Sequence, residues 1–330
     1  MPHYHHIFLS LCCLLASNPA FALSFVMPID CHYGSDCFIQ NYVDANPSTD
    51  ATDYHCGHLT YDGHRGTDFR LTDFTAMQHG VHVLAAANGT VLRLRNDAPD
   101  TGLDHGRDAI SDKECGNGLV IAHAEGYQTQ YCHMKRGSIQ VHVGAAVKAG
   151  DVLGQVGYSG MTEFPHVHFQ VSHYGAIVDP FNTTPDASCA ASLHSLWAPD
   201  VAEHLPYIET AVLGAGFSDH LPQRDRIEAP LVPMPQLASD TAMLTFWVNL
   251  MGLHAGDRLV MKVTAPDGMA VVEKTTIITH VQATAFQFIG KRLHAPLVAG
   301  TYTGDIRVER NRSVVAYRTV SITIAARAVP

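Results

Sequence analysis

The stretch Glu163 to Val171 reads EFPHVHFQV and carries two histidines, His166 and His168, separated by one residue. In a β-strand, successive side chains point to opposite faces, so the two imidazoles would share one face with Gln170. The other face would be apolar. Two neighbouring imidazoles can bind a metal or move protons, but a pair of histidines alone does not complete a site.

Two further segments carry groups that could complete such a site. DGHRGTDFR, residues 62–70, places His64 four residues before Asp68, a spacing that lets a loop bring an imidazole and a carboxylate together. QTQYCHMKRG, residues 128–137, places His133 in a β-rich run. A catalytic zinc site uses three nitrogen, oxygen or sulfur ligands from the protein and leaves a further position open. Taken singly, each segment would also suit a solvated loop or a packed strand histidine.

The composition indicates a folded protein with room for two cores. Of 330 residues, 46% are hydrophobic and 16% are charged. The formal net charge is −10, and no strongly basic run occurs. These features argue against nucleic acid or an anionic membrane as the main partner.

The N-terminus predicts export. The apolar run from Ile7 to Ala16 is too short to span a bilayer, and the small-residue pattern Ala20-Phe21-Ala22 follows it. We expect a signal peptide over residues 1–22, cleaved near Ala22, and a periplasmic or extracellular protein. The alternative is a buried N-terminal helix, since no Lys or Arg precedes the apolar run. No later segment reads as transmembrane.

The cysteines also favour an oxidising compartment. The chain has 8, and signal removal would take away Cys12 and Cys13 and leave an even number. Disulfides are therefore expected, with Cys31 and Cys37 as the plausible local pair. The sequence leaves open how the others pair: Cys56, Cys115, Cys132 and Cys189. No CxxC motif supports a thiolate zinc site.

The chain divides into a β-rich N-terminal domain (residues 23–185, with a Cys-rich lead-in), a linker (residues 186–237) and a second β-rich domain (residues 238–330). In the first, short strands alternate with turn residues, and one hairpin should turn near Glu125-Gly126. The linker combines a candidate helix over Ala191 to Val212 with a Pro-rich connector. The last domain reads as an immunoglobulin-like β-sandwich, to which we assign no chemistry.

In this order, the HxxxD segment, the strand with His133, GQVGYSG and PHVHF resemble the lysostaphin/LytM-type zinc metalloendopeptidases, which cleave peptidoglycan peptides. The resemblance runs from about Gly63 to Phe181. It also covers GVHVLAAANGTV (residues 80–91), GNG (116–118), KAGDVLGQ (148–155) and the closing Asp179-Pro180. It implies an all-β fold class: an N-terminal antiparallel β peptidase domain with a duplicated hybrid motif, here followed by the sandwich.

The resemblance also implies roles for individual residues. His64, Asp68 and His168 match the family's zinc ligands, with one Zn²⁺ per chain, whereas His133 and His166 match its two catalytic histidines that do not bind the metal. Zinc in such a site lowers the pKa of water to about 7 and polarises a carbonyl. Which of the two catalytic histidines acts as general base stays open.

The approach to the His-x-His pair departs from the family. Met161-Thr162-Glu163-Phe164-Pro165 stands where a Ser/Thr and Gly run is common, and Gln170 replaces a frequent Glu. These differences leave the bond preference open. His55, His58 and His123 lie near the motifs in sequence but are more simply explained as surface or packed residues.

We therefore expect an exported zinc metalloendopeptidase acting on peptidoglycan stem or cross-bridge peptides. The alternative is a non-catalytic regulator of cell-wall hydrolases, or a binding module, built on the same fold. The presence of all five site residues favours activity. A phosphotransfer role conflicts with export and with the HxxxD motif. The C-terminal domain could bind the wall or a protein partner, or brace the first domain.

Overall fold

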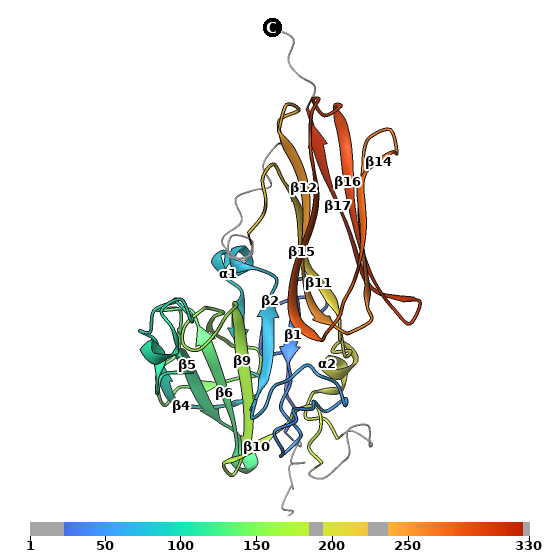
Figure 1. Ribbon diagram of the computed structural model, residues 1–330. Helices are drawn as coiled ribbons and strands as arrows, with labels where there is room; N and C mark the ends of the chain where they lie inside the picture. Colours follow the sequence, from blue (N-terminus) through green and yellow to red (C-terminus); the bar gives the residue numbers. More distant parts are fainter. Residues whose placement is uncertain (1–22, 185–193, 224–236, 326–330) are drawn as a thin grey trace, which may run out of the picture.

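The computed structural model describes residues 23–184, 194–223 and 237–325. It shows a β-rich N-terminal half and a β-sandwich stacked on it (Figure 1). The signal peptide expected over residues 1–22 lies outside the described residues. Within the described part of the chain, no helix combines the length and the apolar character needed to cross a bilayer.

The N-terminal half is built around an eight-stranded antiparallel sheet. Seven strands follow one another across it in the order β1 (Cys37–Asn41), β2 (Thr67–Leu71), β9 (His166–His173), β6 (Tyr127–Met134), β5 (Asn117–Ala122), β4 (Gly89–Arg95) and β7 (Ala146–Val147). Strand β10 (Ala176–Val178) pairs with β9, and β3 (His82–Leu84) pairs with β8 (Val152–Gln155) in a separate ribbon.

Short helical segments join these strands. They are α1 (Phe74–His79) and the 3₁₀ turns η1 (Arg107–Ile110) and η2 (Ala124–Gly126). Asp73 caps α1 by accepting a hydrogen bond from the backbone N–H of Ala76. The η2 turn joins β5 to β6 and has Glu125 and Gly126 at φ 57° and 79°, so the predicted hairpin turn is confirmed.

Strand β9 has the two faces that its alternating sequence predicts. Val167, Phe169 and Val171 are each 0% exposed in the core. Burying such side chains is worth roughly 1.5–3 kcal/mol each, which fixes which face of the strand points inward. The histidines must then lie on the opposite face.

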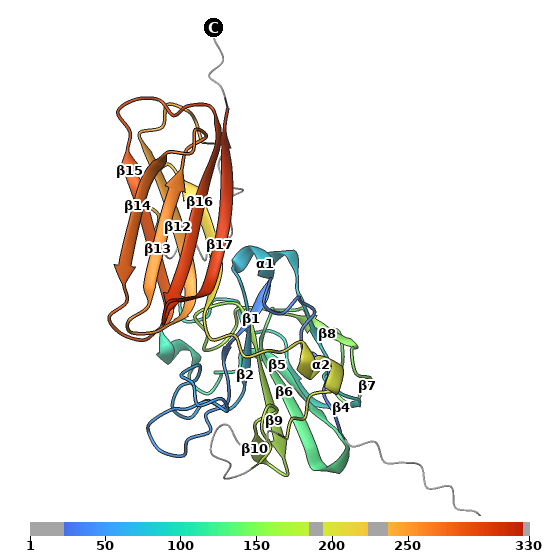
Figure 2. The same ribbon diagram turned by 90° about the vertical axis from the view of Figure 1, so that its right-hand side faces the viewer.

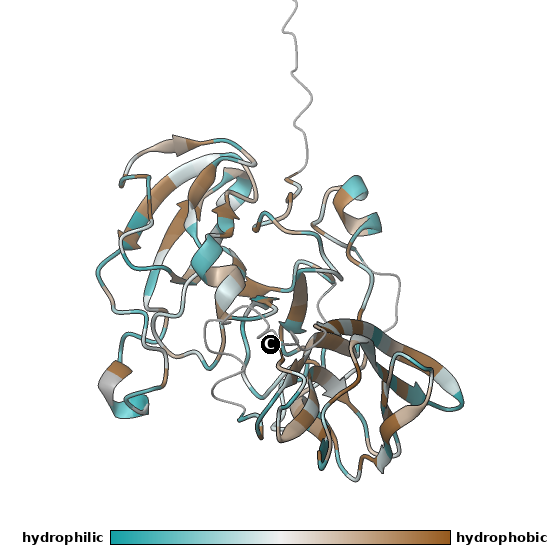
Figure 3. Ribbon diagram, turned by 90° about the horizontal axis from the view of Figure 1, so that it is seen from above, coloured by the Kyte–Doolittle hydropathy of each residue, from teal (hydrophilic) through white to brown (hydrophobic). Residues whose placement is uncertain are grey.

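The second half is a sandwich of two antiparallel sheets (Figure 2). One sheet has the order β11 (Ala211–Ser218), β12 (Met243–Leu253) and β15 (Gln282–Arg292). The other has β14 (Ala270–Ile277), β13 (Arg258–Thr264), β16 (Gly300–Arg310) and β17 (Ser313–Ile324). Residues of contrasting hydropathy alternate along several strands, as expected for sheets with one buried face (Figure 3). The expected all-β fold class with a C-terminal sandwich is confirmed.

The segment between the halves differs from the expectation. The described helix there, α2, covers only Pro199–Glu203, so a helix over Ala191 to Val212 is wrong for most of its described length. Pro199 suits a helix start and Pro206 cannot continue one, which accounts for the short length. Strand β11 also lies within residues 186–237, the range expected to be a linker.

The two halves share an apolar interface. Ala211 and Leu213 of β11 and Met251 of β12 belong to the hydrophobic core of the N-terminal half. Most of the remaining buried apolar residues of the sandwich form a core of their own. The sandwich is thus packed against the N-terminal half through its first sheet.

Two disulfides have both partners in the described residues. Cys31–Cys37 confirms the predicted local pair, and Cys115–Cys132 joins the segment before β5 to the end of β6. Cys56 is also disulfide-bonded. Cys189 lies outside the described residues.

Candidate metal centre

Three side chains converge on the histidine face of β9. His64, Asp68 and His168 each offer a ligand atom, and these atoms lie within 4.8 Å of one another. His64 Nε2 is 3.2 Å from Asp68 Oδ2 and from His168 Nδ1, and Asp68 Oδ1 is 2.8 Å from His168 Nδ1. Asp68 in β2 stands directly opposite His168 in β9, so sheet register brings together residues 100 positions apart.

Neighbouring groups orient this cluster. The carbonyl oxygen of Tyr42 lies 2.7 Å from His64 Nδ1, which must donate to it, and this leaves the Nε2 lone pair for a metal. Asn41 donates to Asp68 Oδ2 at 2.8 Å. The backbone at Gly66 passes close to the His168 ring, and only glycine fits there, because a Cβ would lie 2.6 Å from that ring.

The imidazole groups around Asp68 determine the pKa values within the cluster. Burial would raise the pKa of Asp68, but its interactions with His64, His166 and His168 outweigh this and hold the pKa well below its usual range. Burial lowers the pKa of His168, whereas for His64 the nearby Asp68 overcomes burial and raises the pKa. Among the described residues, no Lys or Arg forms an ion pair with Asp68.

His133 and His166 lie beside the cluster. Their rings are 4.6 Å apart, and the His133 ring is 6.1 Å from that of His168. His133 Nδ1 donates to Ser159 O at 2.8 Å, and His166 Nδ1 lies 2.9 Å from Phe164 O and 3.0 Å from Thr162 Oγ1. The His133 ring therefore presents Nε2 as an acceptor, whereas His166 Nε2 lies 3.5 Å from Asp68 Oδ1. Burial, together with His166 and His168, lowers the pKa of His133 well below its usual value, so its ring is neutral at pH 7.

The backbone at His133 has an unusual conformation. Its φ is 62°, in the left-handed region, close to an irregularity in the pairing of β5 with β6. The backbone N–H of His133 donates to Cys115 O at 2.8 Å, and the adjacent Cys132 is disulfide-bonded to Cys115. Strain of this kind persists only where surrounding contacts impose it, and here it turns the imidazole toward the cluster.

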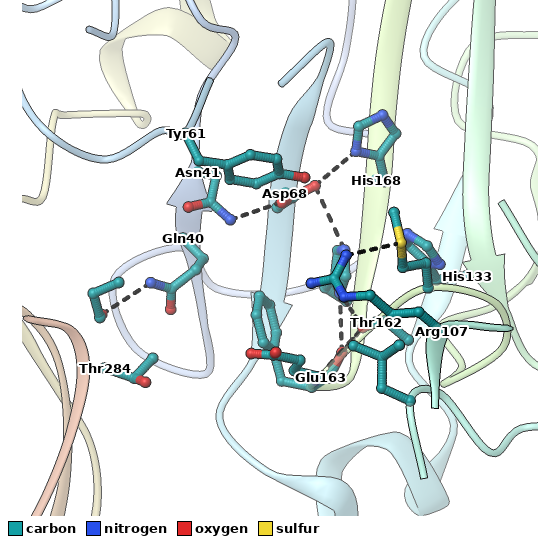
Figure 4. A pocket seen from close by; sticks show the side chains of 15 residues that line it. Gln40, Asn41, Tyr61, Asp68, Arg107, His133, Thr162, Glu163, His168 and Thr284 are labelled. Carbon is teal, nitrogen blue, oxygen red and sulfur yellow. Dashed lines mark hydrogen bonds and ion pairs between the residues drawn. The ribbon is translucent and has the colours of Figure 1, made fainter. Parts of the chain in front are cut away.

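Four of the five candidate site residues line a cavity of about 800 Å³ (Figure 4). Its lining includes Asp68, His133, His166 and His168, together with residues that no motif had singled out: Gln40, Asn41, Tyr61, Leu103, Arg107, Ala283 and Thr284. It also includes the stretch from Met161 to Phe164, which departs from the family pattern.

Two of the lining residues present polar groups to the cavity. Burial and the Asp68 carboxylate raise the pKa of Tyr61 to about 12, so its hydroxyl stays a neutral donor. Arg107 donates to the Met161 thioether at 3.5 Å and, among the described residues, forms no ion pair. Tyr61 is three residues from His64 and could have been noticed. Arg107 begins the short η1 turn, and no motif in the sequence pointed to it.

The other motif-adjacent histidines have separate partners. His55 stacks on Tyr207, with ring centroids 4.3 Å apart. His123 bonds Asn88 O and Thr129 Oγ1, at 2.8 and 2.7 Å. These contacts fit structural roles away from the cluster.

Comparison with known proteins identifies the domain. Residues 62–180 match the model of Peptidase family M23, so this part of the chain is a Peptidase M23 domain, and the predicted resemblance is confirmed. The chain is 29% identical over 119 residues to an uncharacterized metalloprotease of Buchnera aphidicola, covering 36% of this chain and 26% of the relative. It is 31% identical over 108 residues to the peptidoglycan DD-endopeptidase ShyA of Vibrio cholerae, covering 33% and 20%.

Among solved structures, the catalytic domain of lysostaphin from Staphylococcus simulans is similar at 26% identity and a TM-score of 0.27. The match covers 36% of this chain and 76% of that one. The chain matches only 20% to 26% of the length of the two curated relatives above.

Proposed function

We propose that this protein is an exported zinc metalloendopeptidase that hydrolyses peptide bonds in peptidoglycan stem or cross-bridge peptides. The observation that carries the proposal is the convergence of the ligand atoms of His64, Asp68 and His168 within 4.8 Å, beside His133 and His166, in an M23 domain. Asp68 and three of these histidines line one cavity. The substrate class is suggested by the relative named as a peptidoglycan DD-endopeptidase.

The donor set fits zinc. Two imidazole nitrogens and one carboxylate oxygen match the ligands of catalytic zinc sites. The hydrogen bond from His64 Nδ1 to Tyr42 O is the kind of second contact that orients a ligating histidine. A buried aspartate with imidazole neighbours also supplies the negative charge that a divalent cation balances. When bound, zinc would polarise the scissile carbonyl and acidify a water molecule.

The chain's own residues would handle the protons. His133 and His166 are held with Nδ1 donating to backbone carbonyls, so each Nε2 can accept a proton from the attacking water or pass one to the leaving amine. The neutral Tyr61 hydroxyl lines the same cavity as a further donor to developing negative charge. The division of roles between His133 and His166 is left to experiment.

Export is part of the same proposal. The predicted signal over residues 1–22 supports it, as do the disulfides Cys31–Cys37 and Cys115–Cys132, since disulfides persist mainly outside the cytoplasm. Sequencing the N-terminus of protein secreted from cells tests it: we expect the mature chain to begin near Leu23.

Two measurements on the mature protein test the catalytic proposal. Elemental analysis should find about one zinc per chain, and digestion of purified peptidoglycan should release fragments whose masses identify a cut peptide bond. A folded protein that neither binds zinc nor releases fragments would overturn the proposal and favour the regulator or binding-module alternative.

A further inference from the structure

The start of β15 in the sandwich lines the same cavity as the histidine cluster. Ala283 and Thr284 contribute to its lining, although they follow Asp68 by more than two hundred residues in the chain. In Figure 4, Thr284 lies across the cavity from Arg107 and His133. The cavity therefore has one side from the N-terminal half and one from the sandwich.

A buried hydrogen bond joins the two sides. Gln40 of β1 is only 2% exposed, and its Nε2 donates to Ala283 O at 3.0 Å. Its Oε1 accepts from Arg70 at 2.6 Å. Because both ends of the amide are bonded, its orientation is fixed, and losing either partner would leave a buried polar group unpaired. The contact between the two halves is therefore a specific, oriented hydrogen bond and not only van der Waals contact between two surfaces.

The same chain of contacts reaches the catalytic side. Arg70 is 1% exposed, and its guanidinium carbon lies 4.5 Å from the centre of the Phe164 ring. The Phe164 ring is in turn 4.6 Å from the His166 ring. Gln40 and Arg70 therefore link the sandwich edge to the stretch Met161 to Phe164, which also lines the cavity.

Strand β12 and apolar packing against the N-terminal half also hold β15 in position. Strand β15 is an edge strand whose described sheet partner is β12. Met251 of β12 stands opposite Thr284, and its side chain is part of the N-terminal core. The strand that carries Thr284 is thus held against the N-terminal half by apolar packing as well as by Gln40.

We propose that the sandwich is part of the substrate-binding cleft, with Ala283 and Thr284 forming the wall that faces the catalytic histidines. This rests on the proposed function and deepens it: the substrate is a peptide segment long enough to contact both halves. Thr284 is then a specificity-determining residue. Gln40 and Arg70 are positioning residues that keep the wall and the Phe164 stretch at a set separation.

Thr284→Trp tests the wall, because an indole there would narrow the cavity. With synthetic peptides of increasing length, we expect KM to rise about tenfold or more for long peptides, by less for short ones, and by more than kcat falls. Zinc content should stay near one per chain. Thr275→Trp, an exposed threonine of β14 away from the cavity, is the matched control and should leave KM unchanged.

Gln40→Glu is a second variant that does not depend on the fit of an indole. It keeps an oxygen to accept from Arg70 but removes the donor to Ala283 O, so we expect a several-fold rise in KM for long peptides and faster amide exchange in residues 282–286. Wild-type KM in Thr284→Trp at every length, or wild-type KM and exchange in Gln40→Glu, would each overturn the inference.

Failure of the proposed function gives a different result. In that case the wild-type protein would hydrolyse no peptide at all. The wall would still be testable by calorimetric titration of the zinc-loaded protein with the longest synthetic peptide. Weaker binding in Thr284→Trp would support the wall, and equal or undetectable binding in both proteins would overturn it.

Discussion

Asp68 in the N-terminal half and Asp257 in the sandwich are both buried aspartates, at 3% and 1% exposure, but different groups surround them. Asp68 faces His64, His166 and His168. Asp257 accepts two hydrogen bonds of 2.8 Å from Arg310, which also bonds Glu209 and Thr210 where the connecting segment enters the sandwich. Burial raises the pKa of both aspartates, but the interactions with the neighbouring groups outweigh burial, so the pKa of each aspartate is lowered.

The difference separates a site from a structural link. An arginine is always charged and offers only hydrogen-bond donors. A carboxylate paired with it therefore has its oxygens occupied and does not bind a metal. An imidazole can be neutral and offer a lone pair, so a carboxylate among imidazoles can share a metal with them. The Asp68 cluster is therefore suited to binding, whereas the Arg310 cluster fastens the sandwich to its connector.

The largest expected effect comes from removing a member of the first cluster. Asp68→Ala and His168→Ala should lower bound zinc from about one per chain to near zero and reduce hydrolysis by at least about a thousandfold. Elemental analysis and peptide cleavage measure both. Asp62→Ala, an exposed aspartate of the same segment, is the control. Full zinc content in Asp68→Ala would show that Asp68 is not a metal ligand and that its cluster does not differ from the Asp257 cluster in this way.

Removing a neighbour of the cluster should separate chemistry from binding. His133→Ala and His166→Ala should keep zinc but lose about 10²- to 10⁴-fold in kcat, the usual range for a general acid or base. The exposed His142→Ala serves as control. If His166→Ala lost its zinc, His166 would have to be counted as a ligand.

Breaking the second cluster should affect stability and spare chemistry. Arg310→Ala leaves Asp257 buried without its partner, which typically costs about 3 kcal/mol in the free energy of unfolding. Chemical denaturation would measure this loss, with the exposed Arg312→Ala as control. Zinc content and kcat of the folded protein should stay the same. A stability within about 0.5 kcal/mol of wild type would mean that Arg310 does not fasten the sandwich.

A third aspartate, Asp179, is paired with neither imidazoles nor an arginine of the described chain, and so extends the comparison. Asp179 Oδ2 is buried with no hydrogen-bond partner among the described residues, and burial raises the pKa of Asp179 to about 7. The folded state thus holds this proton more tightly than the unfolded state. Its contribution to stability should fall as pH rises from about 4 to 7, by at most about 1.4 kcal/mol per pH unit.

Denaturation of wild type and Asp179→Asn across this pH range isolates that effect. The amide cannot ionise, so the stability of the variant relative to wild type should increase from pH 4 to 7 and then level off. Asp62→Asn, at an exposed aspartate, is the matched control substitution. A constant difference between wild type and Asp179→Asn would mean that Asp179 ionises normally in the folded state.

The local features of the chain were predictable from its sequence. Alternation along residues 163–171 gave the buried and histidine faces of β9 because a strand has a period of two. Turn residues located the hairpin at Glu125-Gly126, and a short separation identified Cys31–Cys37. The ordered motif blocks marked the M23 domain. The strand faces, the hairpin and the local disulfide depend on neighbours in the chain, so the residue types predicted them, whereas the M23 domain was predicted from its resemblance to a known family.

Only the tertiary structure decided which distant residues meet. The family resemblance predicted that Asp68 and His168 share a site, but the register of β2 with β9 is what brings them together. The disulfide Cys115–Cys132 depends on the pairing of β5 with β6. The bond between Gln40 and Ala283 joins residues 243 positions apart and has no local pattern that could announce it. Sequence periodicity reports which face of a strand is buried, but not which strand lies beside it. The histidines were therefore evident from the sequence, whereas the sandwich side of their cavity was not.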